Sequence, residues 1–400
     1  MEKSIEEIRS DFPFLDTDVI YLDNAATALT PEPAIEAMEE YFREYNANIG
    51  RGLHEATKRA SEEFEGARGK VANLINAGPE ELVFTKNSTE ALNLLARGLG
   101  LEEGDKVVTT VLEHHSNLIP WQKLAEEKGI KLKIVHDNDN LIIDPSAIAS
   151  AIDDDTELVT MTHVSNAFGT RQPVEEVGKI AEEEGVLFSV DASQSVGYEP
   201  VDVSKIGCDF LAAPGHKGML GPQGTGILYI SDDIERKITP LLYGGGMVES
   251  VRETGAEFVE SPQIFDGGTP NIPGFIALGG AVDYLQDIGV DRVKERKNEL
   301  TEILLELGEE AKVDTFGPDN PDKLGGILSF NIEGLDQHEV SSILDEAEGI
   351  ATRSGYHCAE PAFDFLDIPG SVRASVNFYN NESEVRTLLS VVSKIVRDLI

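Results

Sequence analysis

Apolar residues recur along the chain at two spacings, one typical of helices and the other of buried strands. Spacings of three and four residues over 55–76 predict a helix with one buried stripe, formed by Ala56, Ala60, Phe64, Ala67, Val71 and Leu74. Beyond it, strand-length apolar runs (ELVFT, DKVVTTVL, IKLKIVH, ELVTMTHV, VLFSVD) alternate with helical stretches such as ALNLLARGLG and PVEEVGKIAEEEG. This alternation predicts βαβ units and a mostly parallel, doubly wound α/β sheet.

The pattern changes after residue 231. Two loops rich in glycine and proline, at 244–247 and 266–274, precede a long helix expected at 275–287. From residue 291 the chain reads helix, strand, helix, strand, strand and helix, which predicts a smaller C-terminal α/β domain. We therefore expect a large domain at 21–285, a small domain at 286–400, and an N-terminal segment at 1–20 that packs with the small domain.

Charge narrows the possible partners. The chain has 33 Lys and Arg against 73 Asp and Glu, a net charge of -40, which repels phosphate backbones and anionic membranes. No run of about 18 apolar residues occurs, and the N-terminus lacks the apolar core of a signal peptide. We expect a cytoplasmic protein that binds neither nucleic acid nor membrane.

The acidic residues are spread along helix faces, a halophile-like pattern. We interpret it as an adaptation to a salt-rich cytoplasm, where high ionic strength screens self-repulsion. A melting temperature that falls as molar salt is added would contradict this interpretation.

Only two cysteines occur, too few for a disulfide scaffold or a cysteine-based zinc site. Cys208 adjoins the apolar run FLAA and is interpreted as core filler. Cys358 lies in a loop between two predicted strands, beside His357 and near Arg353, a setting that favours a reactive thiolate.

Asp191 ends one predicted buried strand, and Lys217 follows the next in the glycine-rich segment PGHKGMLGPQGTG. Because ligands bind at the carboxyl ends of α/β-sheet strands, these two side chains can meet on one small molecule. In pyridoxal phosphate enzymes a lysine binds the cofactor covalently and an acidic residue holds its ring nitrogen. The pair therefore suggests that this protein binds pyridoxal phosphate. A lysine partly withdrawn from water has a lowered pKa, which suits it to bond the cofactor covalently.

Further polar residues follow other strand ends. Ser88 and Thr89 begin a helix whose free N–H groups suit a phosphate, although the local sequence alone favours Ser88 as an ordinary N-cap. His114 can stack on a cofactor ring or be a solvated loop histidine; the pair with His115 lacks a third ligand at metal spacing. Asn166 is either a ligand amide or a turn asparagine. Gln194 follows Asp191 in the same turn, and Arg373 is either a carboxylate clamp or a solvated edge residue.

Nine segments in order resemble the cysteine desulfurase and selenocysteine lyase family, in the class V aminotransferase group of fold-type I pyridoxal phosphate enzymes. They are YLDNAAT, RGLHEAT, FTKNSTEALNL, LEHHSN, HVSNAFGT, VDASQ, GHKGMLGPQGTG, DGGTPN and RSGYHCAEP. The resemblance covers nearly the whole chain.

The resemblance implies a role for each matched residue. Lys217 would bind pyridoxal 5'-phosphate and move protons at the substrate Cα, Asp191 would keep the ring nitrogen protonated, and His114 would stack on the ring. The other cofactor contacts would come from Ser88, Thr89, His216, Gln194 and Asn166, with Thr269 reaching the neighbouring subunit's phosphate in a homodimer. The substrate contacts would come from Arg373, Asn166, Arg353 and His54; no metal is implied.

Cys358 would attack the sulfur of bound L-cysteine, hold it as a persulfide and leave alanine. Because Cys358 follows Arg353 by only five residues, the resemblance is to members that pass sulfur to a separate acceptor protein for iron–sulfur cluster assembly or other biosynthesis. Pro214 departs from the family, since a serine that contacts the phosphate stands there in relatives and proline offers neither hydroxyl nor N–H.

Two alternatives stay open. A selenocysteine lyase shares nearly every residue named, and a class V aminotransferase that acts on another amino acid has no need for the thiol. A catalytically silent scaffold for a sulfur-carrier protein is disfavoured, because the lysine, carboxylate, histidine and thiol are all present.

Overall fold

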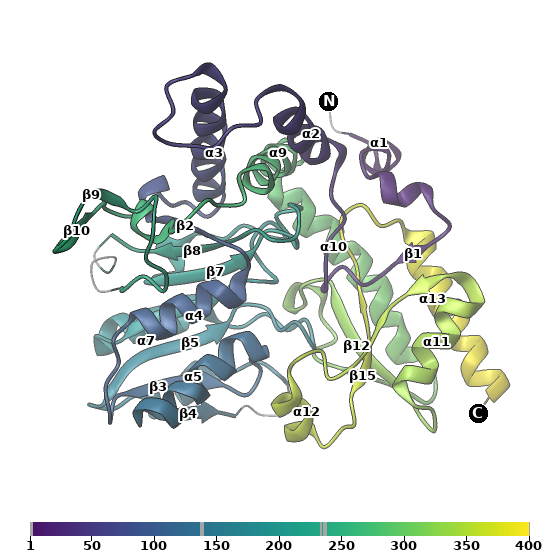
Figure 1. Ribbon diagram of the computed structural model, residues 1–400. Coiled ribbons are helices and arrows are strands. Elements are labelled where there is room, and N and C mark those ends of the chain that lie inside the picture. The colour runs from purple at the N-terminus through teal and green to yellow at the C-terminus, as the bar shows by residue number, and fades with distance from the viewer. Residues whose placement is uncertain (1–2, 137–139, 233, 235–237, 400) are drawn as a thin grey trace.

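The computed structural model describes residues 3–136, 140–232, 234 and 238–399 (Figure 1). A seven-stranded sheet with helices on both faces lies beside a second, separate four-stranded sheet. The predicted fold class, a large mostly parallel α/β sheet with a smaller C-terminal α/β unit, is confirmed. The predicted domain boundaries stay predictions.

The large sheet has the strand order β2-β8-β7-β6-β5-β3-β4. Its strands are β2 (Leu82–Thr85), β3 (Lys106–Thr110), β4 (Lys131–Val135), β5 (Thr156–Thr162), β6 (Leu187–Asp191), β7 (Phe210–Pro214) and β8 (Gly226–Ile230). The pairs from β4 through β7 are parallel, whereas β8 runs antiparallel to both β7 and β2. The parallel strands therefore end at one edge of the sheet, which positions their C-terminal residues together.

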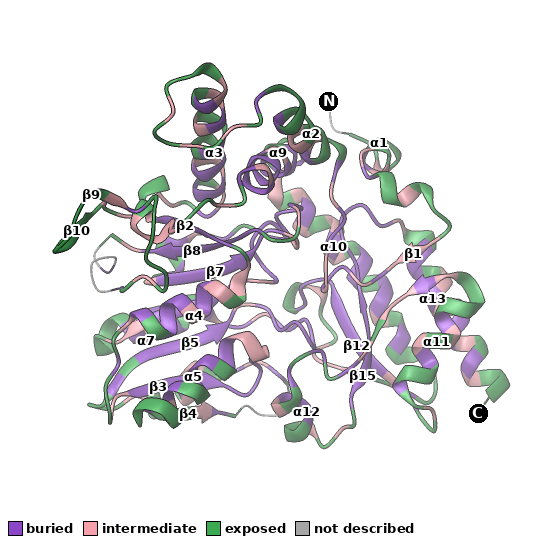
Figure 2. Cartoon of the chain, viewed as in Figure 1, coloured by how far each residue is buried: buried purple, intermediate pink, exposed green. Residues whose placement is uncertain are grey.

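Neighbouring residues along each strand point to opposite faces, so the two faces bury different apolar clusters. Val107 and Leu228 pack with α4 (Ser88–Gly98) and α5 (His115–Lys128), whereas Val108 and Ile227 pack on the opposite face. That second face is covered by α3 (Glu55–Leu74), α6 (Pro145–Ala151), α7 (Val174–Glu184), α8 (Val203–Ile206) and α9 (Ile272–Ile288). Figure 2 shows both sheets buried and the outer helix faces exposed.

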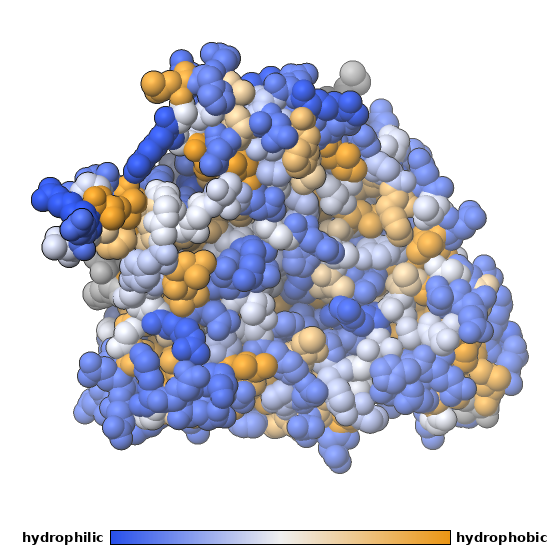
Figure 3. Space-filling model, in the orientation of Figure 1, coloured by the Kyte–Doolittle hydropathy of each residue, from blue (hydrophilic) through white to orange (hydrophobic). Residues whose placement is uncertain are grey.

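The surface is polar, as the acidic composition requires. Hydrophilic residues dominate the face in view in Figure 3. No described helix is long and apolar enough to cross a membrane.

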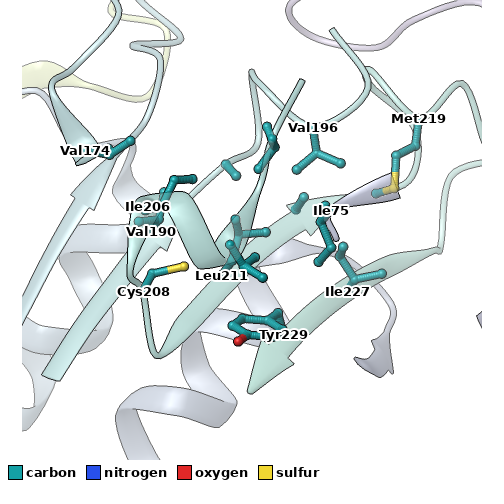
Figure 4. Close-up of a cluster of buried hydrophobic side chains, with 14 of the residues drawn as sticks. Ile75, Val174, Val190, Val196, Ile206, Cys208, Leu211, Met219, Ile227 and Tyr229 are labelled. Carbon is teal, nitrogen blue, oxygen red and sulfur yellow. The ribbon is translucent and has the colours of Figure 1, made fainter. Parts of the chain in front are cut away.

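Cys208 lies within the apolar core, as its sequence context predicts. Its side chain packs with Leu211 and Tyr229 in a buried cluster (Figure 4), and only 5% of the residue is exposed. Burial raises the pKa of its thiol, so Cys208 stays an unreactive thiol.

The smaller sheet has the antiparallel order β11-β12-β15-β14. It comprises β11 (Val313–Phe316), β12 (Ile327–Ile332), β14 (Arg353–Gly355) and β15 (Ser371–Ser375), packed with α10 (Val290–Leu305), α11 (Gln337–Glu348) and α13 (Glu382–Leu399). The helix α12 (Glu360–Leu366) follows Cys358. Near the N-terminus, α1 (Ile5–Ser10) precedes β1 (Ile20–Tyr21), which pairs with β13 (Ile350–Ala351).

Four local details differ from the sequence prediction. The helix expected at 275–287 begins at Ile272, because Asn271 caps it and proline fits its first turn. The sequence 350–355 forms two short strands, β13 and β14, with different partners. The pattern also gave no indication of α2 (Glu32–Glu44), which packs on α9, or of the hairpin formed by β9 (Val248–Arg252) and β10 (Gly255–Phe258).

Candidate active site

A cavity of about 440 Å³ lies where the C-terminal ends of the parallel strands meet the starts of α4 and α5 and the edge of the small sheet. Eleven of the predicted site residues line it: Ser88, Thr89, His114, Asn166, Asp191, Gln194, His216, Lys217, Arg353, Cys358 and Arg373. Ten further lining residues were not predicted as site residues: Ala25, Ala26, Asn87, Ser116, Thr162, Val164, Ser193, Pro214, Ser354 and His357.

Two predicted residues lie outside this cavity. His54 caps α3, and its Nδ1 accepts the N–H of Thr57 at 3.3 Å. Thr269 lines a second cavity together with Arg51 and Gly246. Their assignment to substrate and to a neighbouring subunit's phosphate stays a prediction.

Asp191 and Lys217 face the same cavity from neighbouring strand ends. Asp191 is buried at the end of β6, where it accepts the Ser193 N–H at 3.0 Å, and burial raises the pKa of its carboxyl. Burial also lowers the pKa of Lys217 to about 8, against the opposing attraction of Asp191. An amine with that pKa is partly neutral near neutral pH and can therefore act as a nucleophile.

His114 is the N-cap of α5, and its Nδ1 accepts the N–H of Ser116 at 3.0 Å. Burial, and then the nearby Lys217 ammonium, lower the pKa of His114 to about 3. The ring is therefore neutral, with its proton on Nε2. A flat neutral ring fixed at the cavity wall suits stacking on an aromatic cofactor.

The start of α4 provides the expected anion site, but with a different cap. Asn87, not Ser88, is the N-cap, because its side chain accepts the Glu90 N–H at 2.9 Å. Ser88 and Thr89 are consequently the first two helical residues, whose N–H groups have no partner within an α-helix and suit a phosphate. The Thr89 hydroxyl lies 2.7 Å from that of Ser116, at the start of α5.

Arg373 is a clamp candidate and not a solvated edge residue, because only 2% of it is exposed. One guanidinium nitrogen donates to Asp23 Oδ1 at 2.9 Å and another to the Asn166 carbonyl at 2.8 Å. Asp23 belongs to the segment YLDNAAT, and its pairing with a residue 350 positions later has no local sequence signal. These two bonds fix the plane of the guanidinium.

Four buried polar atoms on residues that line the cavity have no hydrogen-bond partner in the described part of the chain. They are His216 Nδ1, Gln194 Oε1, His357 Nδ1 and Arg373 Nε. Buried polar atoms almost always have partners, so this wall matches a polar ligand with several hydrogen-bonding groups. Together with the lysine, the buried carboxylate and the start of α4, it fits pyridoxal phosphate.

Cys358 approaches the cavity from the small-sheet side, on an exposed turn before α12. Its carbonyl accepts the N–H of His115 at 2.8 Å, and the carbonyl of His357 accepts the Asn166 amide at 2.6 Å. The turn is thus bonded to the same edge that carries His114 and Asn166. The sequence-predicted lysine and thiol therefore face one cavity.

No group of three or more His, Cys, Asp or Glu side chains within the described ranges could hold a metal ion.

Comparisons with known proteins identify the family. Residues 20–388 match the family model for class-V aminotransferases. A probable cysteine desulfurase of Methanothermobacter thermautotrophicus is 46% identical over 394 residues, 98% of each chain. A cysteine desulfurase of Haloferax volcanii is 40% identical over 97% of this chain and 96% of its own.

Solved structures give the same result. The apo cysteine desulfurase of Thermococcus onnurineus NA1 has a TM-score of 0.96 and 45% identity, and the match covers 99% of this chain and 100% of that one. The cysteine desulfurase CsdA of Escherichia coli, with an S-sulfonic acid, has a TM-score of 0.91 and 30% identity over 99% of both chains.

Proposed function

The chain belongs to the class-V aminotransferase family, and we propose that within it this protein is a pyridoxal-phosphate-dependent cysteine desulfurase. The observation that carries the proposal is the presence of a pKa-lowered lysine, a buried carboxylate and an exposed cysteine on one cavity. The reaction converts L-cysteine to L-alanine and leaves the sulfur on Cys358. We propose that the protein acts in the cytoplasm.

Pyridoxal phosphate, when bound, supplies an electron sink that weakens the bonds at the substrate Cα. Lys217 would hold the cofactor covalently and move the proton at Cα, while Asp191 would keep the ring nitrogen protonated and His114 would cover one ring face. Ser88, Thr89 and His216 would hold the phosphate, and Gln194 and Asn166 would bond the ring oxygen. Among the described residues His216 Nδ1 has no partner and is open to the phosphate, and Gln194 Oε1 has none and can accept the O–H of the ring hydroxyl.

The substrate carboxylate binds Arg373, whose Nε has no partner among the described residues and whose orientation is fixed by Asp23 and Asn166. Arg353, exposed beside the cavity, adds positive charge at the entrance. With the carboxylate held, the substrate sulfur is directed towards Cys358.

The Cys358 thiolate attacks the sulfur of the bound cysteine. One S–S bond forms at Cys358, the C–S bond of the substrate breaks, and its electron pair passes to the substrate carbon. That carbon then takes a proton, for which Lys217 is the proposed donor, and alanine leaves. Because Cys358 is exposed, its persulfide is open to a separate acceptor protein.

The proposed assembly is a homodimer. Large apolar side chains are exposed around the β9–β10 hairpin, namely Leu242, Tyr243, Val251 and Phe258. Figure 3 shows apolar atoms gathered beside that hairpin. Thr269 lies on the neighbouring second cavity, where a partner subunit's phosphate would be reached.

One experiment tests the proposed activity. Protein reconstituted with pyridoxal phosphate should gain a visible absorbance band, and addition of L-cysteine with a thiol reductant should release alanine and sulfide in equal amounts. L-selenocysteine added in competition distinguishes a selenocysteine lyase. A protein that gains no visible band would instead be a silent scaffold, and one that forms no alanine from L-cysteine would not be a desulfurase.

A further inference from the structure

His357, the residue before the proposed nucleophile, is bonded into a chain of hydroxyl groups. Its Nε2 lies 3.0 Å from the Ser371 hydroxyl, which lies 3.0 Å from that of Ser329, and Ser329 donates to the Ala167 carbonyl at 2.6 Å. The residue is buried, with 7% exposed. This series of hydrogen bonds links the Cys358 turn to β15 through Ser371, to β12 through Ser329, and to the loop after β5 through Ala167.

The direction of these bonds fixes the tautomer of His357. A carbonyl only accepts, so Ser329 donates to Ala167, Ser371 donates to Ser329, and Ser371 therefore accepts the proton of His357 Nε2. Burial and the positive charge of Arg373 lower the pKa of His357 to about 2. The ring consequently stays a neutral donor at working pH and is a poor base for the Cys358 thiol.

The backbone at this point is held in an unfavourable conformation. His357 and Cys358 have φ angles of 50° and 58°, in the left-handed region that non-glycine residues avoid. Two consecutive left-handed residues persist only where their surroundings hold them. The surroundings here are the His357 ring bond and the two carbonyl bonds, from Asn166 to His357 and from His115 to Cys358.

We propose that His357 is a positioning residue for Cys358: by donating to Ser371 it holds the left-handed turn that directs the thiol into the Lys217 cavity. In this role His357 acts through the position of Cys358 and transfers no proton itself, although the residue also lines the cavity. Its consequence for catalysis rests on the proposed desulfurase function, whereas the anchoring of the turn does not.

The first test measures sulfur transfer in the holoenzyme. We expect persulfide formation on Cys358, in a single turnover with L-cysteine, to fall about tenfold in His357→Phe and Ser371→Ala, because misplacing a reacting group costs that much or more. His357→Gln, whose amide can donate from about the position of Nε2, should recover most of the rate. His136→Phe, at an exposed histidine outside the cavity, is the matched control.

The second test needs no cofactor. It distinguishes an effect on the position of Cys358 from an effect on the proton affinity of its thiol. Cys208 is buried, so iodoacetamide reports on Cys358, and we expect the pH midpoint of its alkylation to be the same in all variants. Hydrogen exchange should meanwhile be faster at the His115 amide, which is bonded to the Cys358 carbonyl, in His357→Phe and Ser371→Ala.

Wild-type persulfide rates in both His357→Phe and Ser371→Ala would overturn the proposal. A shifted alkylation midpoint that accounts for the loss would also overturn it, since His357 would then act on the thiol proton. If His357→Phe does not fold, Ser371→Ala and His357→Gln decide. An unsubstituted protein that forms no persulfide refutes the proposed function instead, and hydrogen exchange still tests the anchoring.

Discussion

The two halves of the cavity are held in different ways. The cofactor half uses residues that end buried strands, begin helices or lie in the turns next to them, such as Asp191 at the end of β6 and Ser88 at the start of α4. The Cys358 half is a left-handed turn bonded to residues about 190 and 240 positions earlier, Asn166 and His115. Strands, helices and the turns next to them therefore position the cofactor contacts. Hydrogen bonds to residues distant in the sequence position the nucleophile Cys358.

The sharpest way to separate the halves is to remove the thiol. Cys358→Ala should keep the visible band of the bound cofactor but lower sulfide release by about a thousandfold or more, since the nucleophile of a covalent step is lost. Lys217→Ala should lose the covalent cofactor as well. Absorbance spectra and sulfide assays on both variants measure this; full sulfide release by Cys358→Ala would remove the thiol from the mechanism.

The clamp that bridges the halves should give the next largest effect. Arg373→Lys should raise the KM for L-cysteine by about tenfold to a hundredfold, because lysine cannot reproduce the planar fork that bonds Asp23, Asn166 and a carboxylate together. Steady-state kinetics measure it. Arg353→Lys, at an exposed position, is the control and should change KM less; equal effects would place the carboxylate elsewhere.

The pH dependence of cofactor capture isolates the cofactor half. Lys217 attacks as the neutral amine, and with a pKa of about 8 roughly one molecule in ten is neutral at pH 7. The capture rate should therefore rise with pH up to about 8 and then level off, instead of rising towards the ordinary lysine value.

Two substitutions should move this midpoint in opposite directions. Asp191 raises the pKa of Lys217 and Arg353 lowers it, so Asp191→Asn should shift the midpoint to lower pH and Arg353→Gln to higher pH. Stopped-flow absorbance after mixing cofactor-free protein with pyridoxal phosphate measures both. A midpoint near 10 in the unsubstituted protein would show that burial does not lower this pKa.

The smallest expected effect is at Pro214, which lines the phosphate side of the cavity without a hydroxyl or an N–H. Pro214→Ser should tighten binding of pyridoxal phosphate about fivefold, the worth of one added hydrogen bond. Equilibrium dialysis of a Lys217→Ala background excludes the covalent contribution. Weaker binding would mean that the proline shapes the cavity and that no phosphate contact is missing there.

The amino-acid sequence predicts the cofactor half well and the nucleophile half only in part. Strand ends are visible in hydrophobic periodicity, so Asp191, Asn166 and Lys217 could be assigned to one sheet edge from the pattern of residues. Periodicity carries no information on which distant residues meet, so the Asp23–Arg373 pair and the Ser371–Ser329 chain behind His357 were missed. Asn87 was missed for a local reason: three consecutive polar residues can each cap a helix, and the backbone alone decides among them.

The Asp23–Arg373 pair joins the first and last parts of the chain. Nearby, the Asn24 amide donates to the Ser375 carbonyl, and β1 pairs with β13. During synthesis on the ribosome, β7 and the Lys217 turn that follows it are therefore made long before Cys358 and Arg373. Because Cys358 and Arg373 lie near the end of the chain, removal of sulfur from cysteine can begin only once translation is nearly finished.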